Sequence, residues 1–167
     1  VYDYFVATES GEFHPWTELV TEFKYDAALP FVDILVPTMD TVRYSFLLEA
    51  FFDIERPVLF NGSSGTGKSV IVQECLNRLA VDSIAVPFNV NFSAQTTSPS
   101  TQEMIELRLE KKRKGVFGAP GGKRLVAFVD DVNMPQREVY GAQPPIELLR
   151  QVIDKVHHFR SGGGFYD

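Results

Sequence analysis

One stretch of eight residues limits what this chain can fold into more than any other. It matches the pattern G-x-x-x-x-G-K-[ST] at every fixed position and runs Gly62, Ser63, Ser64, Gly65, Thr66, Gly67, Lys68, Ser69. Glycines let successive backbone N–H groups turn inward around a phosphate, in conformations that a Cβ would obstruct. A helix that begins directly after this loop adds the positive end of its dipole. The pattern therefore predicts a phosphate-binding loop between a strand and a helix.

The residues around the loop fit this interpretation. The short apolar run Val58-Leu59-Phe60 stops at Asn61-Gly62, as a buried parallel strand does, and apolar residues recur at helical spacing over residues 68–80. A chance match to the loop pattern is expected in roughly one percent or fewer of chains this long. Lys68 would supply a point charge for the β- and γ-phosphates, and the Ser69 hydroxyl would join the shell of a Mg²⁺ ion.

A second candidate half-site follows about sixty residues later. The apolar stretch 125–129 predicts a buried strand, and the carboxylates of Asp130 and Asp131 come directly after it. Open α/β sheets bind ligands at this end of their strands. We expect Asp130 to bind Mg²⁺ directly or through water and Asp131 to polarise the attacking water. Most ATPases of this type carry Glu at the second position, so Asp131 has a shorter reach.

The remaining pattern alternates strands and helices, which predicts an α/β fold with a parallel sheet. The first thirty residues are rich in aromatics and predict short strands or extended segments laid over a core. Pro87 moves the strand predicted over residues 84–92 towards an edge of the sheet. A helix is expected over residues 40–53, capped by Thr38 or Asp40, because apolar residues recur there at three- and four-residue spacing (Val42, Tyr44, Leu47, Leu48 and Phe51). The other expected elements are a helix from a Ser100–Glu103 capping box to Lys114 closed by Gly115, a surface loop over 116–122, and a helix over 144–158 opened by Pro144-Pro145.

Composition limits the class of protein. The chain has 167 residues, 44% of them hydrophobic and 23% charged, which is typical of one globular domain. Its net charge of −6 argues against nucleic-acid binding, and no apolar run approaches the ~18–20 residues that span a membrane. The single cysteine, Cys75, excludes an internal disulfide and fits a reducing compartment. We therefore expect an intracellular globular protein without a signal peptide, and the initial Val1 suggests a segment of something longer.

Three weaker features favour ordinary structural roles. The run Lys111-Lys112-Arg113-Lys114 is expected at a helix C-terminus, where cations complement the dipole, and therefore as a solvated face rather than a nucleic-acid patch. Adjacent histidines His157-His158 point about 100° apart on a helix and lack a third ligand, which argues against a metal site. Trp16 is expected to pack in the core or at an interface, and Cys75 in the core.

Four stretches together carry a resemblance to a known family. They are VPTMDTVRYSFLL (residues 36–48), GSSGTGKSVIV (62–72), NFSAQTTSPSTQEMIE (91–106) and FVDDVNMPQREVYGAQPPIELLRQ (128–151). The chain resembles the dynein heavy chain of the axonemal type, in the large subdomain of the third AAA+ module of its motor ring. The continuation YGAQPPIELLRQ is far more specific than the phosphate loop, and the resemblance covers nearly the whole chain.

The resemblance implies a P-loop NTPase (AAA+) fold, a three-layer parallel sheet with flanking helices and strand order 5-1-4-3-2. Residues 1–35 would be an aromatic lead-in from the preceding module, and residues 36–167 a partial large subdomain. The chain would stop before the fourth and fifth core strands, the sensor residue, the arginine finger and the lid. The missing fourth strand would normally separate residues 58–60 from residues 125–129. In the family, Gly-Gly-Phe-Tyr-Asp follows the last helix more directly, whereas residues 155–161 stand between them in this chain.

The resemblance also implies the site and its partners. The expected cofactors are ATP or ADP with Mg²⁺, held by Lys68, Ser69 and Asp130, with the hydrolytic water at Asp131. A segment that such modules place against adenine corresponds to Leu35, Val36, Pro37 and Thr38. Expected partners are neighbouring AAA+ modules, microtubules, and the intermediate and light chains of the parent motor, in the cytoplasm and cytoskeleton of the ciliary or flagellar axoneme. Neither nucleic acid nor a membrane is an expected partner.

Two alternatives remain for the function. The module could bind ATP or ADP as a structural or regulatory clamp without hydrolysing it, which the Asp at position 131 favours. A P-loop GTPase or small-molecule kinase is disfavoured, because the sequence contains no Asn-Lys-x-Asp segment for reading guanine and no basic lid after the acidic pair.

Overall fold

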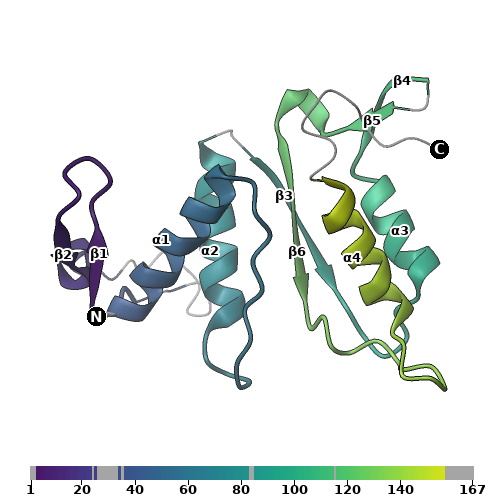
Figure 1. Ribbon diagram of the computed structural model, residues 1–167, viewed down its shortest axis with the longest axis horizontal. Coiled ribbons are helices and arrows are strands. Elements are labelled where there is room, and N and C mark those ends of the chain that lie inside the picture. Colours follow the sequence, from purple (N-terminus) through teal and green to yellow (C-terminus); the bar gives the residue numbers. More distant parts are fainter. Residues whose placement is uncertain are drawn as a thin grey trace. The chain divides into compact units, whose positions relative to one another are not determined.

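A computed structural model describes residues 3–23, 25, 34, 36–82, 85–114 and 116–156. The chain divides into two compact units, Val1–Cys75 and Leu76–Asp167. Figure 1 labels the helices and strands of both. Residues 157–167 lie outside the described residues. They include the pair His157-His158 and most of the residues 155–161 that precede the final glycines.

The first unit begins with a small hairpin that covers a helix. Strands β1 (Tyr4–Val6) and β2 (Phe13–Pro15) pair antiparallel, and the 3₁₀ turn η1 (Trp16–Leu19) follows. Trp16 is 5% exposed, and its ring lies 5.1 Å from that of Phe5 and 5.3 Å from that of Phe46. Aromatic pairs in tilted and edge-on arrangements stabilise such clusters beyond their buried area. The prediction of short strands is therefore confirmed within residues 3–23, whereas residues 24 and 26–30 lie outside the described residues.

Helix α1 (Met39–Asp53) confirms the predicted element and shows that Thr38 is its cap. The Thr41 amide donates to Thr38 Oγ1 at 3.2 Å, and the Thr38 amide donates to Thr41 Oγ1 at 2.8 Å. These reciprocal bonds form a capping box. Three of the apolar residues that recur at helical spacing, Tyr44, Leu47 and Phe51, are 38–40% exposed. The hairpin packs on the Phe46 side of the helix instead.

Residues 58–60 do not form the predicted buried strand. Val58 is 42% exposed and Leu59 76%, and neither belongs to a strand. A short apolar run becomes a strand only where a neighbour accepts and donates its backbone hydrogen bonds. No strand within the described ranges pairs with these residues.

Helix α2 (Lys68–Val81) confirms the element predicted after the loop. Four residues of its expected inner face, Ile71, Val72, Cys75 and Leu76, are at most 9% exposed. Cys75 is only 2% exposed, which confirms its predicted role in core packing.

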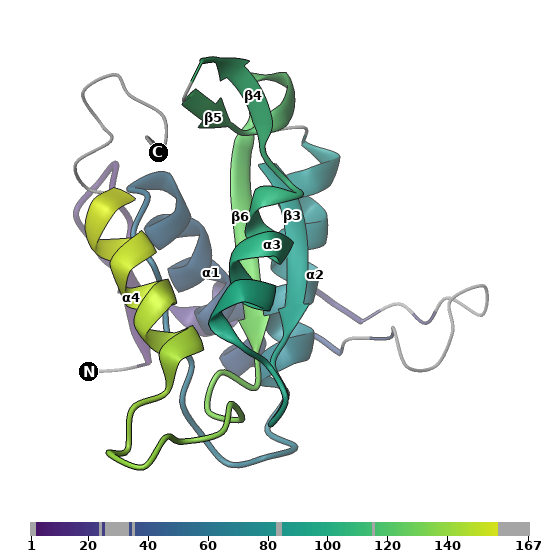
Figure 2. The ribbon, with the colours of Figure 1, turned by 90° about the vertical axis from the view of Figure 1, so that its right-hand side faces the viewer.

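The second unit contains the parallel sheet that the sequence predicted. Strands β3 (Ala85–Asn91) and β6 (Arg124–Asp130) pair in register from Ala85 opposite Arg124 to Asn91 opposite Asp130. Helices α3 (Ser98–Glu106) and α4 (Pro144–Val156) lie on one face of this sheet (Figures 1 and 2). Between the layers is a core built from Phe88, Val90 and Phe92, with Met104, Ile105, Leu125, Val129, Val132 and Leu149 packed against it.

Helix α3 differs from the prediction at both ends. Its cap is Thr97, whose side chain accepts from the Ser100 amide, rather than Ser100. The helix ends at Glu106 and not at Lys114, because 3₁₀-type bonds from the amides of residues 108 and 109 to the carbonyls of residues 105 and 106 close it.

The residues after α3 form a second hairpin in place of the predicted helix end and loop. Strand β4 (Glu110–Arg113) pairs antiparallel with β5 (Val116–Gly118), and a 3₁₀ turn, η3 (Pro120–Gly122), leads into β6. The register of this hairpin shifts between Lys111 and Arg113, so its pairing is irregular there.

Candidate functional site

The phosphate-loop residues form a turn that only glycines adopt without strain. Gly65 has φ 78° and Gly67 has φ 82°, both in the left-handed region. A Cβ added at either position would meet no atom within 4 Å. The glycines are therefore required by the backbone conformation and not by crowding. The loop is exposed, so the space in front of it is open to a ligand.

The side chain of Lys68 lies inside this loop. Its Nζ donates to Gly62 O at 3.0 Å, to Ser63 O at 2.6 Å and to Thr66 Oγ1 at 3.3 Å. Thr66 Oγ1 in turn donates to Ser63 O at 3.0 Å. The ammonium group is thus positioned by the loop's own oxygens, where a bound phosphate would compete for it.

Helix α2 directs unpaired donors into the same space. The amide of Ile71 donates to Gly67 O at 3.1 Å, which is the first bond of the helix. The amides of Lys68, Ser69 and Val70 come before it and are the open donors of the helix N-terminus. These donors, the ammonium of Lys68 and the hydroxyl of Ser69 suit the phosphates of a nucleotide and its Mg²⁺. The residues present therefore fit the cofactors that the sequence predicted.

The acidic pair lies at the C-terminal end of β6, as predicted. Asp130 is the last residue of the strand and pairs in register with Asn91. The amide of Asp131 donates to Asp130 Oδ1 at 3.0 Å, which fixes one oxygen of that carboxylate. Asp131 has φ 53°, an uncommon conformation for a residue other than glycine, and its side chain is exposed. The chain therefore bends at Asp131, directly after the end of β6.

Gln143 orders the loop after the acidic pair, a role that sequence reasoning missed. Its Nε2 donates to Asn133 O at 3.1 Å and to Pro135 O at 2.6 Å. Its own carbonyl accepts from the Ile146 amide at 3.0 Å in the first turn of α4. One residue thus connects the loop to the helix. The available signal was its place directly before Pro144-Pro145, where a residue bordering the helix start belongs.

The structure brings together the residues within each half-site. The phosphate loop belongs to the first unit, and Asp130 and Asp131 belong to the second. Of the predicted adenine segment, Leu35 lies outside the described residues, Val36 is 49% exposed, Pro37 is half-buried, and Thr38 uses its hydroxyl in the cap of α1.

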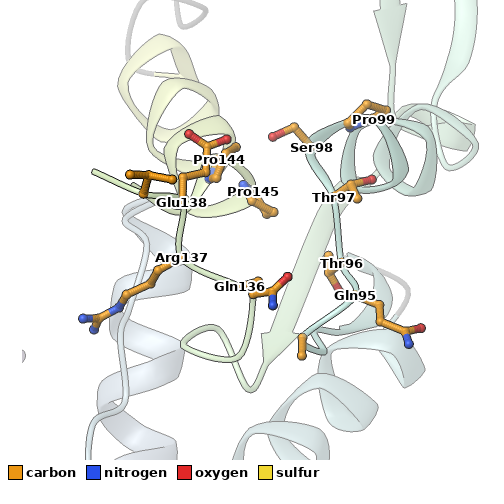
Figure 3. Close-up of a pocket in the computed structure, with 12 residues that line it drawn as sticks. Gln95, Thr96, Thr97, Ser98, Pro99, Gln136, Arg137, Glu138, Pro144 and Pro145 are labelled. Atoms are coloured by element: carbon orange, nitrogen blue, oxygen red, sulfur yellow. The ribbon is translucent and has the colours of Figure 1, made fainter. Parts of the chain in front are cut away.

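A pocket also lies in the second unit, beyond the ends of β3 and β6. It has a volume of about 750 Å³ and is lined by residues 94–99, 136–139 and 144–145. Figure 3 shows Ser98, Gln136 and Pro145 around the hollow, while Arg137 points away from it. No local sequence pattern predicts this pocket, because it forms only where two loops far apart in the chain meet.

The described residues contain neither a cluster of metal-ligating side chains nor a helix suited to a membrane. No three His, Cys, Asp or Glu side chains gather closely enough there to hold a metal ion by themselves. None of the helices in the described ranges combines the length and the apolarity that crossing a bilayer requires.

Comparison with known proteins agrees with the resemblance. Residues 23–163 match the family described as P-loop containing dynein motor region. The chain is 52% identical over 153 residues to dynein axonemal heavy chain 6 of Homo sapiens, covering 92% of this chain and 4% of that protein. It is 48% identical over 162 residues to dynein axonemal heavy chain 3 of Homo sapiens, covering 95% of this chain and 4% of that protein.

A relative from a distant organism gives the same result. The chain is 45% identical over 155 residues to the dynein-1-beta heavy chain of the flagellar inner arm I1 complex of Chlamydomonas reinhardtii, covering 92% of this chain and 3% of that protein. The chain thus spans about 4% of the length of the first relatives named. Because the family match extends over most of its residues, the chain belongs to the P-loop-containing motor region of the axonemal dynein heavy chains.

Proposed function

We propose that this chain is the ATP-binding part of the third AAA+ module of a dynein heavy chain. The observation that carries the proposal is the loop 62–69, in which two left-handed glycines, an inward ammonium and a helix N-terminus converge on one open space. This combination suits the phosphates of ATP or ADP.

Each residue of the loop has a defined task in this proposal. Lys68 leaves its bonds to the carbonyls of Gly62 and Ser63 and turns to the terminal phosphates. The open amides at the start of α2 donate to the phosphate oxygens. Ser69 and Asp130 hold Mg²⁺, which when bound neutralises charge on the phosphates. Segment 35–38 is proposed to border the adenine.

Hydrolysis in this proposal depends on Asp131. Its exposed carboxylate would accept a proton from the attacking water, while Asp130 stays with the metal. The short Asp side chain supports slow turnover. The same observation favours the alternative, a structural or regulatory module that binds nucleotide without hydrolysing it.

The wider role follows from the relatives, whose names place them in axonemes and in a flagellar inner arm. We propose that residues 1–35 lead in from a preceding module and residues 36–167 belong to the third. This module would respond to its nucleotide, contact neighbouring AAA+ modules, and contribute to movement along microtubules in cilia together with intermediate and light chains.

A competition assay tests the binding proposal. A protein that carries the complete module is titrated with a fluorescent ATP analogue, which is then displaced by ATP, ADP or GTP. We expect displacement by the adenine nucleotides at much lower concentrations than by GTP. Equal displacement by GTP would contradict the proposal.

A turnover assay separates slow hydrolysis from binding alone. Phosphate release is measured for the same protein and for Asp131→Glu, which adds the missing methylene. If Asp131 faces the attacking water, the longer carboxylate should raise the rate. No release from either protein would support the non-hydrolysing alternative.

A further inference from the structure

The second hairpin concentrates positive charge in an acidic chain. Residues 107–124 contain seven cationic side chains and one carboxylate, although the whole chain has a net charge of −6. The cations are Arg108, Lys111, Lys112, Arg113, Lys114, Lys123 and Arg124. Every residue of β4 is exposed, and so is Lys114 in the turn that follows. We call Lys111, Lys112, Arg113 and Lys114 the basic hairpin cluster.

Within the described residues, most cations of this cluster form no ion pair. Lys112 Nζ pairs with Glu110 Oε2 at 2.9 Å, and its side-chain stem crosses Gly118 on the paired strand. Within the described ranges, Lys111, Arg113 and Lys114 have no carboxylate at ion-pair distance. Three exposed like charges therefore occur within four consecutive residues, without a carboxylate in the described ranges to compensate them.

The ordinary explanation for these cations no longer holds. Cations at a helix C-terminus would offset the helix dipole, but α3 ends at Glu106, before the cluster begins. The cluster also lies at the end of the sheet where β6 begins, opposite Asp130, as Figures 1 and 2 show for this unit. Within the second unit, the cluster therefore lies away from the Asp130 half of the predicted nucleotide site.

The form of the hairpin limits what can bind. It has two strands, so each outer edge presents backbone N–H and C=O groups without a strand beside it in the described part of the chain. A second copy of this hairpin would bring the same cations together and be repelled. An extended acidic segment would gain both backbone hydrogen bonds and ion pairs.

We propose that the basic hairpin cluster is a docking site for an extended acidic polypeptide segment of a partner. The complementary charge speeds the encounter, and the open strand edge sets the direction of the bound segment. Nucleic acid fits less well, because no exposed aromatic side chains alternate with these cations for base stacking.

Fluorescence anisotropy of a labelled deca-glutamate peptide tests this proposal on the whole chain. We expect saturable binding at low salt that weakens steeply as salt rises towards ~0.5 M, because exposed charges are screened. Combining Lys111→Gln, Arg113→Gln and Lys114→Gln should weaken binding about tenfold, since three exposed ionic contacts are lost.

Two single variants are matched controls at the same hairpin. Lys112→Gln should change affinity less than any change at the three unpaired positions, because Glu110 already neutralises Lys112. Glu110→Gln should tighten binding, because it removes a repelling carboxylate and releases Lys112. A gain in affinity cannot result from misfolding, and circular dichroism checks the fold of each variant.

Three results would overturn the proposal. They are the absence of saturable peptide binding at low salt, equal affinity of the triple variant and the unchanged chain, and tighter binding of a ten-nucleotide oligothymidine than of deca-glutamate. The last result would assign the surface to nucleic acid instead.

Discussion

Replacing Lys68 by methionine removes the ammonium group from the centre of the phosphate loop and keeps most of the side chain. In the ligand-free loop this group donates to two carbonyls and one hydroxyl of residues 62–66. These bonds lie at an exposed site, where water replaces them at little cost. The main loss is therefore expected in the nucleotide complex.

The size of that loss follows from the contact with phosphate. A hydrogen bond to a charged group contributes ~1.5–3 kcal/mol, which corresponds to a dissociation constant raised by roughly 10- to 150-fold. Thr66→Val is a matched control, because it removes the hydroxyl that contacts Lys68 and Ser63 but no charge. A single neutral hydrogen bond predicts a loss of about tenfold or less for that variant.

Isothermal titration calorimetry with Mg-ATP measures both variants in a protein that carries the complete module. Both titrations are run at one fixed ionic strength, since salt weakens the charged contact. Equal dissociation constants for Lys68→Met and the unchanged protein would refute the assignment of residues 62–69. A larger effect of Thr66→Val would show that loop shape, and not the charge, determines affinity.

Three further predictions concern the second unit. Asp131→Asn should leave the affinity for Mg-ATP nearly intact and suppress phosphate release, whereas Asp130→Asn should weaken Mg²⁺-dependent binding. If both variants change affinity and phosphate release in the same way, the two carboxylates do not have these separate roles. Gln143→Ala should lower the free energy of unfolding by ~1–2 kcal/mol, because the carbonyls of Asn133 and Pro135 lose their donor. Denaturant titration measures this change, and an unchanged free energy of unfolding would contradict the prediction. The hydrogen bond from Arg150 lowers the pKa of Glu147 below its ordinary value of 4.5. The ionised Glu147 carboxylate therefore stabilises α4 above pH 4.5, and this stabilisation is lost as the pH falls through the lowered pKa. An NMR titration should show that the pKa of Glu147 rises in Arg150→Gln.

Elements whose stability is mainly local were predicted well from the sequence. The helices after Thr38 and after Gly67 have strong caps or loop signals and a regular apolar pattern, and both appear where expected. The stretch 125–129 is apolar throughout and forms β6 beside β3. The acidic pair was correctly placed because it follows directly from the end of that strand.

Elements that depend on a distant partner were predicted badly. Residues 107–114 have good helix propensity, yet pairing with β5 makes part of them a strand, and propensity is a weak guide against such tertiary contacts. Residues 58–60 show the opposite error, because β-propensity without a pairing strand does not produce a strand.

The cap of α3 and the hydrogen bonds of Gln143 were also difficult to predict from the sequence. Both Thr97 with Ser100 and Ser100 with Glu103 satisfy a capping signature, and Pro99, favoured in the first turn, decides for the earlier one. Gln143 acts through carbonyls eight and ten residues before it, a relation that no local pattern encodes.

Hydrogen exchange with and without Mg-ATP shows whether the loop 62–69 holds the phosphates of the nucleotide. The measurement follows individual backbone amides in a protein that carries the complete module. The account predicts slower exchange at residues 63–70, whose amides surround the proposed phosphate position, and unchanged exchange in the hairpin over residues 110–118. Nucleotide binding without slower exchange at residues 63–70 would contradict the claim that this loop holds the phosphates.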